Sequence, residues 1–156
     1  MTLVEESAPD AAQRGGGQDA AERGGTGGDP AEAVPLVLLV EDDPWIRSAV
    51  RALLEQEGYR VAETELGEEA LPLTRRLRPD VVLMDLVLPV MSGLDTVRSL
   101  KEHADTAAVP VIATSGLRLP GADALAAAGF AGSLGKPYRG AELFAELQRV
   151  LARRGA

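Results

Sequence analysis

The chain of 156 residues contains no cysteine, a single histidine and only 3% aromatic residues. Without cysteine it can form no disulfide, no thiol nucleophile and no cysteine zinc site. It also lacks an apolar run near the roughly 20 residues needed to cross a bilayer. Residues 1–6 lack the basic and apolar regions of a signal peptide. These absences predict a cytoplasmic protein with no membrane partner.

Positive charge is scarce as well. Sixteen Lys and Arg residues face 24 Asp and Glu residues, which gives a formal net charge of −8. Such an excess opposes attraction to nucleic acids and anionic membranes, so we expect no direct nucleic-acid binding. Apolar residues make up 46% of the chain and charged residues 26%, which is ordinary for a globular domain.

Residues 1–33 differ in composition from the remainder. They hold seven of the 17 glycines, few large apolar residues, and seven acids against two bases. A segment of this kind cannot bury enough apolar area to offset its ordering entropy, which predicts a disordered, acidic, Gly-rich tail. Its glycine cluster at 24–28 is not a phosphate loop, because no strand precedes it and no Lys-Ser/Thr follows. We therefore expect one folded domain over residues 34–154.

From Pro35 onward, short apolar runs alternate with helical patterns. The patterns predict strands at 36–40, 59–63, 81–84, 109–114 and 131–134, and helices at 44–57, 67–77, 92–102, 120–128 and 138–153. Five such units in sequence predict an α/β fold, a doubly wound five-stranded parallel sheet with helices on both faces. Because little sequence follows the last helix, we expect no attached output domain.

Polar residues follow four of the predicted strands. The most informative is Asp85, which ends an apolar run of a kind that is buried on both faces of a parallel sheet. The other strand ends carry Glu41-Asp42, Thr114-Ser115 and Lys136-Pro137. In open α/β sheets, ligands bind in the crevice outside the carboxyl ends of the strands.

Acidic groups meeting in that crevice would repel one another unless a cation lay among them. An all-oxygen site with room for water suits Mg²⁺ best. A lysine and a hydroxyl added to the acids make a site for a tetrahedral oxyanion. Phosphoryl transfer needs mainly such positioning and charge neutralisation, which makes Asp85 a candidate nucleophile.

With these motifs, at residues 38–43, 80–93, 109–116 and 136–138, the chain resembles the receiver domains of two-component response regulators. The resemblance covers residues 35 to 154, and four motifs in the same order make it specific. It implies a flavodoxin-like sheet in the order 2-1-3-4-5. It also implies that Asp85 accepts a phosphoryl group from a sensor histidine kinase or a phosphotransfer protein.

The resemblance assigns roles to the remaining site residues. Asp42 and Asp85 bind Mg²⁺ directly, together with the backbone carbonyl of Val87, and Glu41 assists through water. Ser115 holds a phosphoryl oxygen and Lys136 pairs with the phosphoaspartate. Such a protein is not an enzyme acting on a separate substrate. It assists its own phosphorylation and hydrolysis and signals through contacts with a downstream protein.

The sequence is compatible with several alternatives. Asp43 is better explained as a helix cap than as a ligand, and strand alternation lets only one of Thr114 and Ser115 face the site. Ser133 stands where the family usually has an aromatic residue, which leaves a phosphorylation-independent interaction module as the alternative function. A phosphohydrolase of the dehalogenase type needs a second acid two residues after its nucleophile. This chain has Val87 at that position, which argues against such an activity. Since Val87 and Leu117 cannot orient an attacking water, we expect slow self-dephosphorylation.

Overall fold

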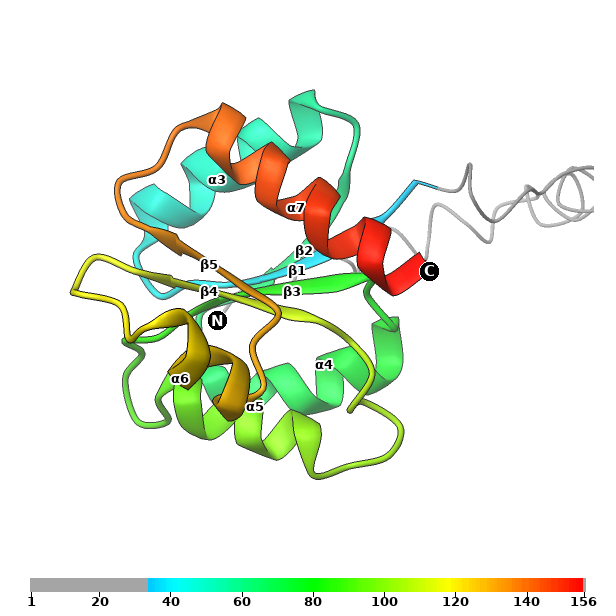
Figure 1. The fold of residues 1–156 in the computed structure, drawn as a ribbon. Coiled ribbons are helices and arrows are strands. Elements are labelled where there is room, and N and C mark those ends of the chain that lie inside the picture. The colour runs from blue at the N-terminus through cyan, green and yellow to red at the C-terminus, as the bar shows by residue number, and fades with distance from the viewer. Residues whose placement is uncertain (1–33, 156) are drawn as a thin grey trace, which may run out of the picture.

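The computed structural model describes residues 34–155, so the tail predicted for residues 1–33 lies outside the described residues. Five parallel strands form one sheet in the order β2-β1-β3-β4-β5 (Figure 1). The strands are β1 (Leu36–Val40), β2 (Arg60–Thr64), β3 (Val81–Asp85), β4 (Val111–Ser115) and β5 (Gly132–Gly135). The doubly wound fold and its strand order are therefore confirmed.

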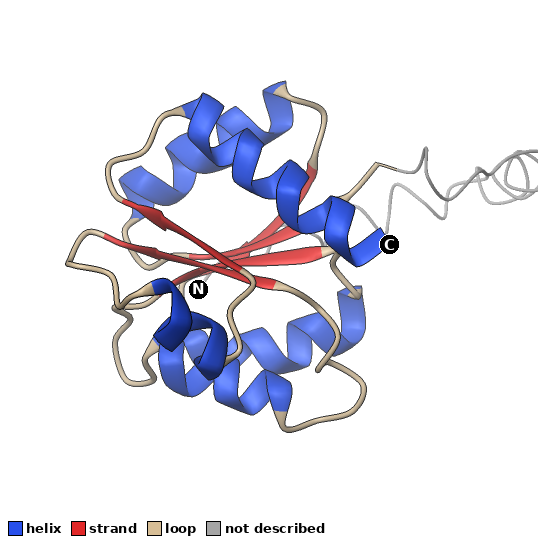
Figure 2. Ribbon diagram, viewed as in Figure 1, coloured by secondary structure: helices blue, strands red, loops and turns tan. Residues whose placement is uncertain are grey.

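Helices cover both faces of the sheet, as Figure 2 shows. One face carries α3 (Pro44–Gln56) and α7 (Gly140–Gly155). The other carries α4 (Ala70–Leu77), α5 (Gly93–Lys101) and α6 (Ala122–Ala128), with the short 3₁₀ turn η2 (Gly67–Glu69) before α4. Among the described residues, no helix combines the length and the apolar character that a membrane span requires.

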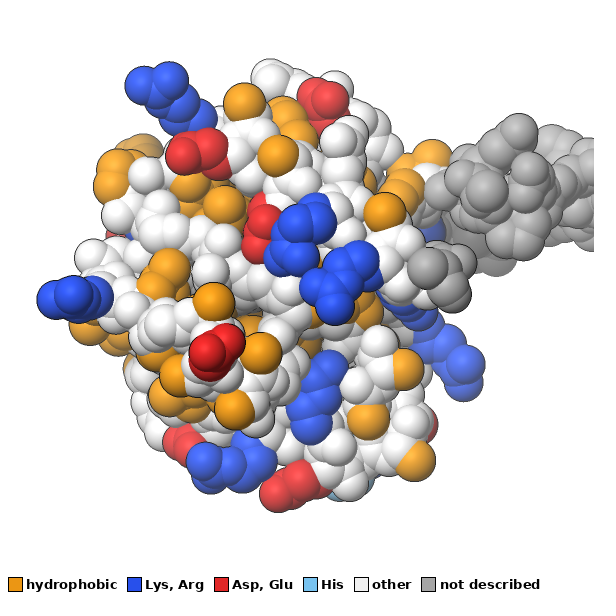
Figure 3. Space-filling view, viewed as in Figure 1, with side chains coloured by type: hydrophobic (Ala, Val, Ile, Leu, Met, Phe, Trp, Pro, Cys, Tyr) orange, Lys and Arg blue, Asp and Glu red, His pale blue; other side chains and the backbone are white. Residues whose placement is uncertain are grey.

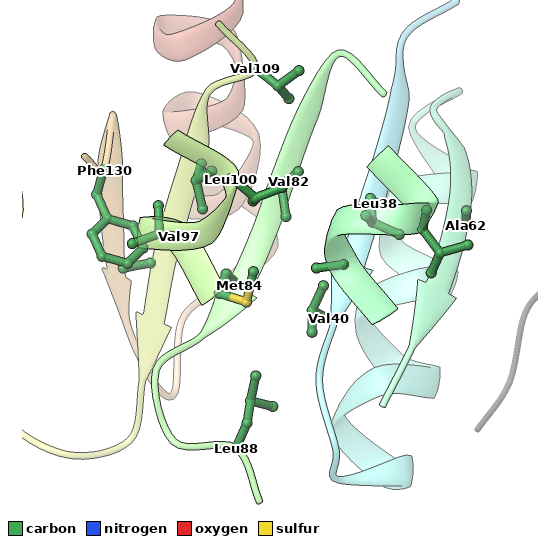
Figure 4. Close-up of a cluster of buried hydrophobic side chains, with 14 of the residues drawn as sticks. Leu38, Val40, Ala62, Val82, Met84, Leu88, Val97, Leu100, Val109 and Phe130 are labelled. Carbon is green, nitrogen blue, oxygen red and sulfur yellow. The ribbon is translucent and has the colours of Figure 1, made fainter. Parts of the chain in front are cut away.

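The sheet separates two hydrophobic cores. On one side Val82 and Met84 of β3 pack with Val97 and Leu100 of α5, and part of this cluster is drawn in Figure 4. On the other side, alternate residues of the same strands pack against α3 and α7. All five residues of β3 are buried, because a strand covered on both faces has no solvent side.

The helix starts follow local chemistry. Asp43 caps α3 by accepting the N–H groups of Trp45 and Ile46, and Pro44 occupies the first helical position, as predicted. Pro72 lies in the first turn of α4, where its missing N–H leaves no hydrogen bond unmade. Helical spacing predicts that Leu94 and Val97 of α5 both face inward; Val97 is buried, but Leu94, in the first turn, has a residue exposure of 41%.

Side chains of α7 satisfy backbone groups at the edge strand β5. The N–H of Ser133 donates to Oε2 of Glu146 at 2.9 Å, and Nη2 of Arg149 donates to the carbonyl oxygen of Ala131 at 2.9 Å. A Cβ atom on Gly132 would overlap the carboxylate end of Glu146, so a larger residue here would displace this side chain. In the view of Figure 3, in which α6 and α7 lie at the front, acidic and basic side chains are interspersed.

Candidate functional site

The carboxyl ends of β1, β3 and β5 bring three predicted residues into contact. Lys136 Nζ donates to Glu41 Oε1 at 2.7 Å and to Asp85 Oδ2 at 3.0 Å. These partners lie 95 and 51 residues away in the sequence. Both carboxylates are buried, with residue exposures of 3% for Glu41 and 5% for Asp85. Buried charges are stable when they are paired and hydrogen-bonded, as they are here.

The protein environment shifts the proton affinities of this cluster. Burial raises the pKa of Glu41, and the nearby charge of Asp85 acts in the same direction against the hydrogen bonds from Lys136 and Asp43. Burial alone would lower the pKa of Lys136, but its hydrogen bonds to Glu41 and Asp85 raise that pKa above the usual value. Lys136 is therefore a cation at neutral pH, fixed between two carboxyl groups.

Both oxygens of Asp85 have fixed partners. Oδ1 accepts the backbone N–H of Val87 at 3.0 Å, and Oδ2 accepts Lys136 Nζ. The neighbouring N–H of Leu86 extends the sheet ladder to the carbonyl oxygen of Thr114 at 2.9 Å. The carboxylate thus lies at the end of a rigid strand in one defined orientation.

Three carboxylates gather at this end of the sheet. Glu41, Asp42 and Asp85 each offer an oxygen, and these oxygens lie within 4.8 Å of one another. Asp42 is the most exposed of the three, and the second oxygen of Glu41 accepts the N–H of Asp43 at 3.1 Å. A set of carboxylate oxygens open to water on one side fits a hard divalent cation such as Mg²⁺.

The carboxylates line an open pocket of about 470 Å³. Its lining comprises Glu41, Asp42, Asp43, Ile46, Asp85, Val87, Gly116, Leu117 and Lys136. The side chains of Val87 and Leu117 stand at its mouth, with residue exposures of 52% and 68%. The pocket therefore combines a charged floor with two apolar groups that offer no hydrogen bond to water.

Two residues with hydroxyl groups, Thr114 and Ser115, end the strand next to that of Asp85. Thr114 pairs in register with Asp85 across β3 and β4, and both Thr114 and Ser115 are buried. Ser115 Oγ accepts the N–H of Leu117 at 3.0 Å, which ties it to the loop that lines the pocket. The assignment of the phosphoryl-binding hydroxyl to Ser115 stays a prediction.

Sequence reasoning missed one contact at this site. Arg47, one turn into α3, donates from Nη1 to the carbonyl oxygen of Glu41 at 2.8 Å. The sequence signal for this contact was the position of Arg47, four residues after the capping Asp43. A helical side chain at that position lies close to the end of the preceding strand. Attention to strand ends alone could not reveal it.

The sequence pattern of the response regulator receiver domain matches residues 37–148. The chain belongs to the response regulator receiver domain family. Among curated proteins, the receiver domain is 41% identical over 76 residues to the protein PilH of Pseudomonas aeruginosa, an alignment that covers 49% of this chain and 63% of PilH. It is 40% identical over 85 residues to the polar-differentiation response regulator DivK of Brucella anthropi, covering 54% and 69% of the two chains.

Solved structures agree with this assignment. The receiver domain of the sensor histidine kinase PA1611 from Pseudomonas aeruginosa, which has magnesium coordinated in its active site cleft, is 36% identical with a TM-score of 0.70. The chemotaxis protein CheY4 of Vibrio cholerae is 32% identical, also with a TM-score of 0.70. The alignments cover 77% and 76% of this receiver domain and 99% of each neighbour. As a receiver domain, the chain is a two-component signalling protein.

Proposed function

We propose that this receiver domain is a phosphorylation switch in which Asp85 accepts a phosphoryl group from a phosphohistidine. The donor is a sensor histidine kinase or a phosphotransfer protein. The observation that carries the proposal is the buried Asp85 carboxylate, held by the Val87 N–H on one oxygen and by Lys136 on the other. A carboxylate fixed in this way is ready for in-line attack on phosphorus.

In the transfer, a carboxylate oxygen of Asp85 forms a bond to phosphorus while the bond between phosphorus and the donor imidazole nitrogen breaks. The imidazole leaves with the electron pair and is reprotonated from solvent. The Lys136 ammonium, already against Asp85, then pairs with the acyl phosphate. The hydroxyl of Ser115 holds a second phosphoryl oxygen.

The donor set described above fits Mg²⁺. In our proposal Asp42, Asp85 and the carbonyl of Val87 hold the ion directly, and Glu41 assists through water. A bound ion would supply positive charge to the phosphoryl oxygens. Lys136 supplies a further positive charge at Oδ2 of Asp85.

The proposed output is a contact with a downstream protein, made by the domain formed by residues 34–154 in the cytoplasm. In this scheme the receiver domain has no separate substrate. It assists its own phosphorylation and hydrolysis. Receiver domains usually carry an aromatic residue whose side chain moves with the phosphorylation switch. This chain has Ser133 at that position, and the N–H of Ser133 donates to the carboxylate of Glu146 in α7.

The test is incubation of the full chain with Mg²⁺ and acetyl phosphate, followed by intact-mass measurement. The expected result is the addition of one phosphoryl group to the wild type and none to Asp85→Asn. Asp95→Asn, which removes an exposed carboxylate on α5, serves as the matched control and should be phosphorylated like the wild type. A wild type that gains no mass with this donor or with a phosphorylated histidine kinase would favour the phosphorylation-independent interaction module.

A further inference from the structure

Within residues 34–155, the proposed function leaves one buried acid without a role. Glu63, on the edge strand β2, has a residue exposure of 8%. Its carboxylate lies between two arginines of α3, with Oε1 3.6 Å from Arg47 Nε and Oε2 3.1 Å from Arg51 Nη1. Burying a carboxylate costs free energy unless it is paired with a cation. The two arginines therefore offset the cost of burying Glu63 on the edge strand.

Arg47 connects this ion pair to the acidic pocket. Its side chain is only 11% exposed, and while Nε faces Glu63, Nη1 donates to the carbonyl oxygen of Glu41 at 2.8 Å. At 3.6 Å the contact with Glu63 is an ion pair and not a hydrogen bond, and it attracts the planar guanidinium into an orientation in which another of its donors faces the end of β1. Glu63 thereby orients Arg47 toward the end of β1.

The contact completes the hydrogen bonding of Glu41. Its N–H donates to the carbonyl oxygen of Thr64 at 3.0 Å, and its carboxylate accepts from Asp43 N and Lys136 Nζ. Its carbonyl, bound by Arg47, belongs to the same peptide group as the nitrogen of Asp42. Because a peptide group is planar, holding that carbonyl fixes the plane from which Asp42 projects.

We propose that Arg47 is a positioning residue for the divalent cation. Glu63 orients Arg47, and Arg47 in turn holds the Glu41–Asp42 peptide group toward the pocket. The proposal rests on the proposed function in that it takes Asp42 and Asp85 as ligands. Groups that orient metal ligands contribute to affinity even though they do not touch the ion. Arg47 acts here through the backbone rather than through a ligand side chain.

Arg51 provides a matched control. It lies one turn further along α3 and shares Glu63, and its ion pairs among the described residues are with Glu55 and Glu63. A purely structural role of the ion pairs predicts similar effects for loss of either arginine. A positioning role predicts a specific effect of Arg47.

The experiment compares Arg47→Met with Arg51→Met in the full chain, since methionine retains an unbranched apolar stem. Mg²⁺ is titrated while the emission of Trp45, the only tryptophan, is followed, with calorimetry as a second readout. We expect Arg47→Met to bind Mg²⁺ about tenfold more weakly than the wild type, and Arg51→Met to stay within about twofold. Equal Mg²⁺ affinities of the two variants would overturn the proposal.

A second readout separates positioning from folding. With acetyl phosphate as donor, Arg47→Met should need more Mg²⁺ for half-maximal phosphorylation while approaching the wild-type rate at saturation. If Arg47→Met does not fold, the pair Arg47→Lys and Arg51→Lys replaces it. An ammonium cannot bridge a carboxylate and a carbonyl as a guanidinium does, so Arg47→Lys should bind Mg²⁺ more weakly than Arg51→Lys. Equal affinities in this pair would likewise refute the role of Arg47.

The two proposals fail in different ways. A wild type that neither binds Mg²⁺ nor accepts a phosphoryl group contradicts the proposed function itself. A wild type that does both, with an Arg47 variant indistinguishable from its Arg51 control, contradicts only the positioning role.

Discussion

Gly93 lies so close to Asp85 that a Cβ atom on the glycine would overlap the aspartate's carbonyl oxygen and lie 2.8 Å from Cα of Leu86. The N–H of Gly93 also donates to the carbonyl oxygen of Leu86 at 3.1 Å. The start of α5 is therefore packed directly against the backbone of the proposed phosphoacceptor. This contact explains why position 93 is occupied by glycine.

We predict that Gly93→Ala lowers the free energy of unfolding by about 1–3 kcal/mol, because the added methyl group must displace backbone rather than a flexible side chain. Gly140 is the matched control, since it is also the first residue of a helix but has its nearest side-chain atoms at 3.5 Å or more. Gly140→Ala should be neutral or slightly stabilising. Urea unfolding measures both, and equal stabilities of the two variants would contradict the close-packing argument.

Loss of Lys136 should destabilise the protein in a manner that depends on divalent cation. Removing one partner of a buried ion pair costs about 3 kcal/mol or more, and Lys136→Met leaves Glu41 and Asp85 facing each other. In urea unfolding with EDTA we expect the full loss, and saturating Mg²⁺ should reduce it by neutralising the same acids. Lys101→Met is the control, because Lys101 Nζ donates to the carbonyl oxygens of Ala107 and Val109, so its loss should not respond to Mg²⁺.

The apolar mouth of the pocket should make the phosphorylated protein long-lived. Val87→Asn introduces a group that can hydrogen-bond an attacking water, which is worth about 1 kcal/mol or roughly a fivefold faster loss of phosphate. The decay of the phosphorylated mass after removal of the donor measures the rate. Val90→Asn, in the same loop but outside the pocket lining, should decay like the wild type. An unchanged rate in Val87→Asn would exclude this role for Val87.

Tyr138 should make stability fall at alkaline pH. Burial raises the pKa of its phenol above the usual 10.0, and the charges of Glu41 and Asp85 act in the same direction. Above pH 10 the unfolded state therefore releases a proton that the folded state retains, so the free energy of unfolding decreases as the pH rises. Tyr138→Phe should flatten this decrease in pH-dependent urea unfolding.

A direct measurement uses the fact that the chain contains only two tyrosines. In Tyr59→Phe, the phenolate absorbance reports Tyr138 alone, and ionisation should begin only well above pH 10. Phenolate formation near pH 10 in the folded variant would contradict the raised pKa.

Much of the fold follows from local sequence signals. The apolar runs located all five strands, and Asp43-Pro44 located the start of α3, because capping and strand burial depend on a few adjacent residues. Boundaries differ by one or two positions where a local feature intervenes. The fourth strand begins at Val111 rather than at residue 109, after Pro110, which has no N–H to donate. Leu94 shows that helical spacing does not decide which side the first turn of α5 faces.

The site was less accessible from sequence. Topology predicted that Glu41, Asp85 and Lys136 meet, because the carboxyl ends of parallel strands share one edge. The position of Arg47 after the capping Asp43 was a local signal, but the contact of Arg47 with Glu63 could not be predicted, since it depends on how α3 lies across β1 and β2. Such contacts between side chains and backbone of different elements leave no periodic trace in the sequence.

The pairing of Glu146 and Arg149 with the backbone around Ser133 has a consequence for assembly. Unoccupied amide and carbonyl groups on an outer strand are a template on which a foreign strand can add. Here α7 occupies two such groups, the Ser133 N–H and the Ala131 carbonyl oxygen, which opposes the addition of another chain's backbone at this border of the sheet. A complex formed on this side must then be held by the side chains of the flanking helices, where partner choice is encoded residue by residue.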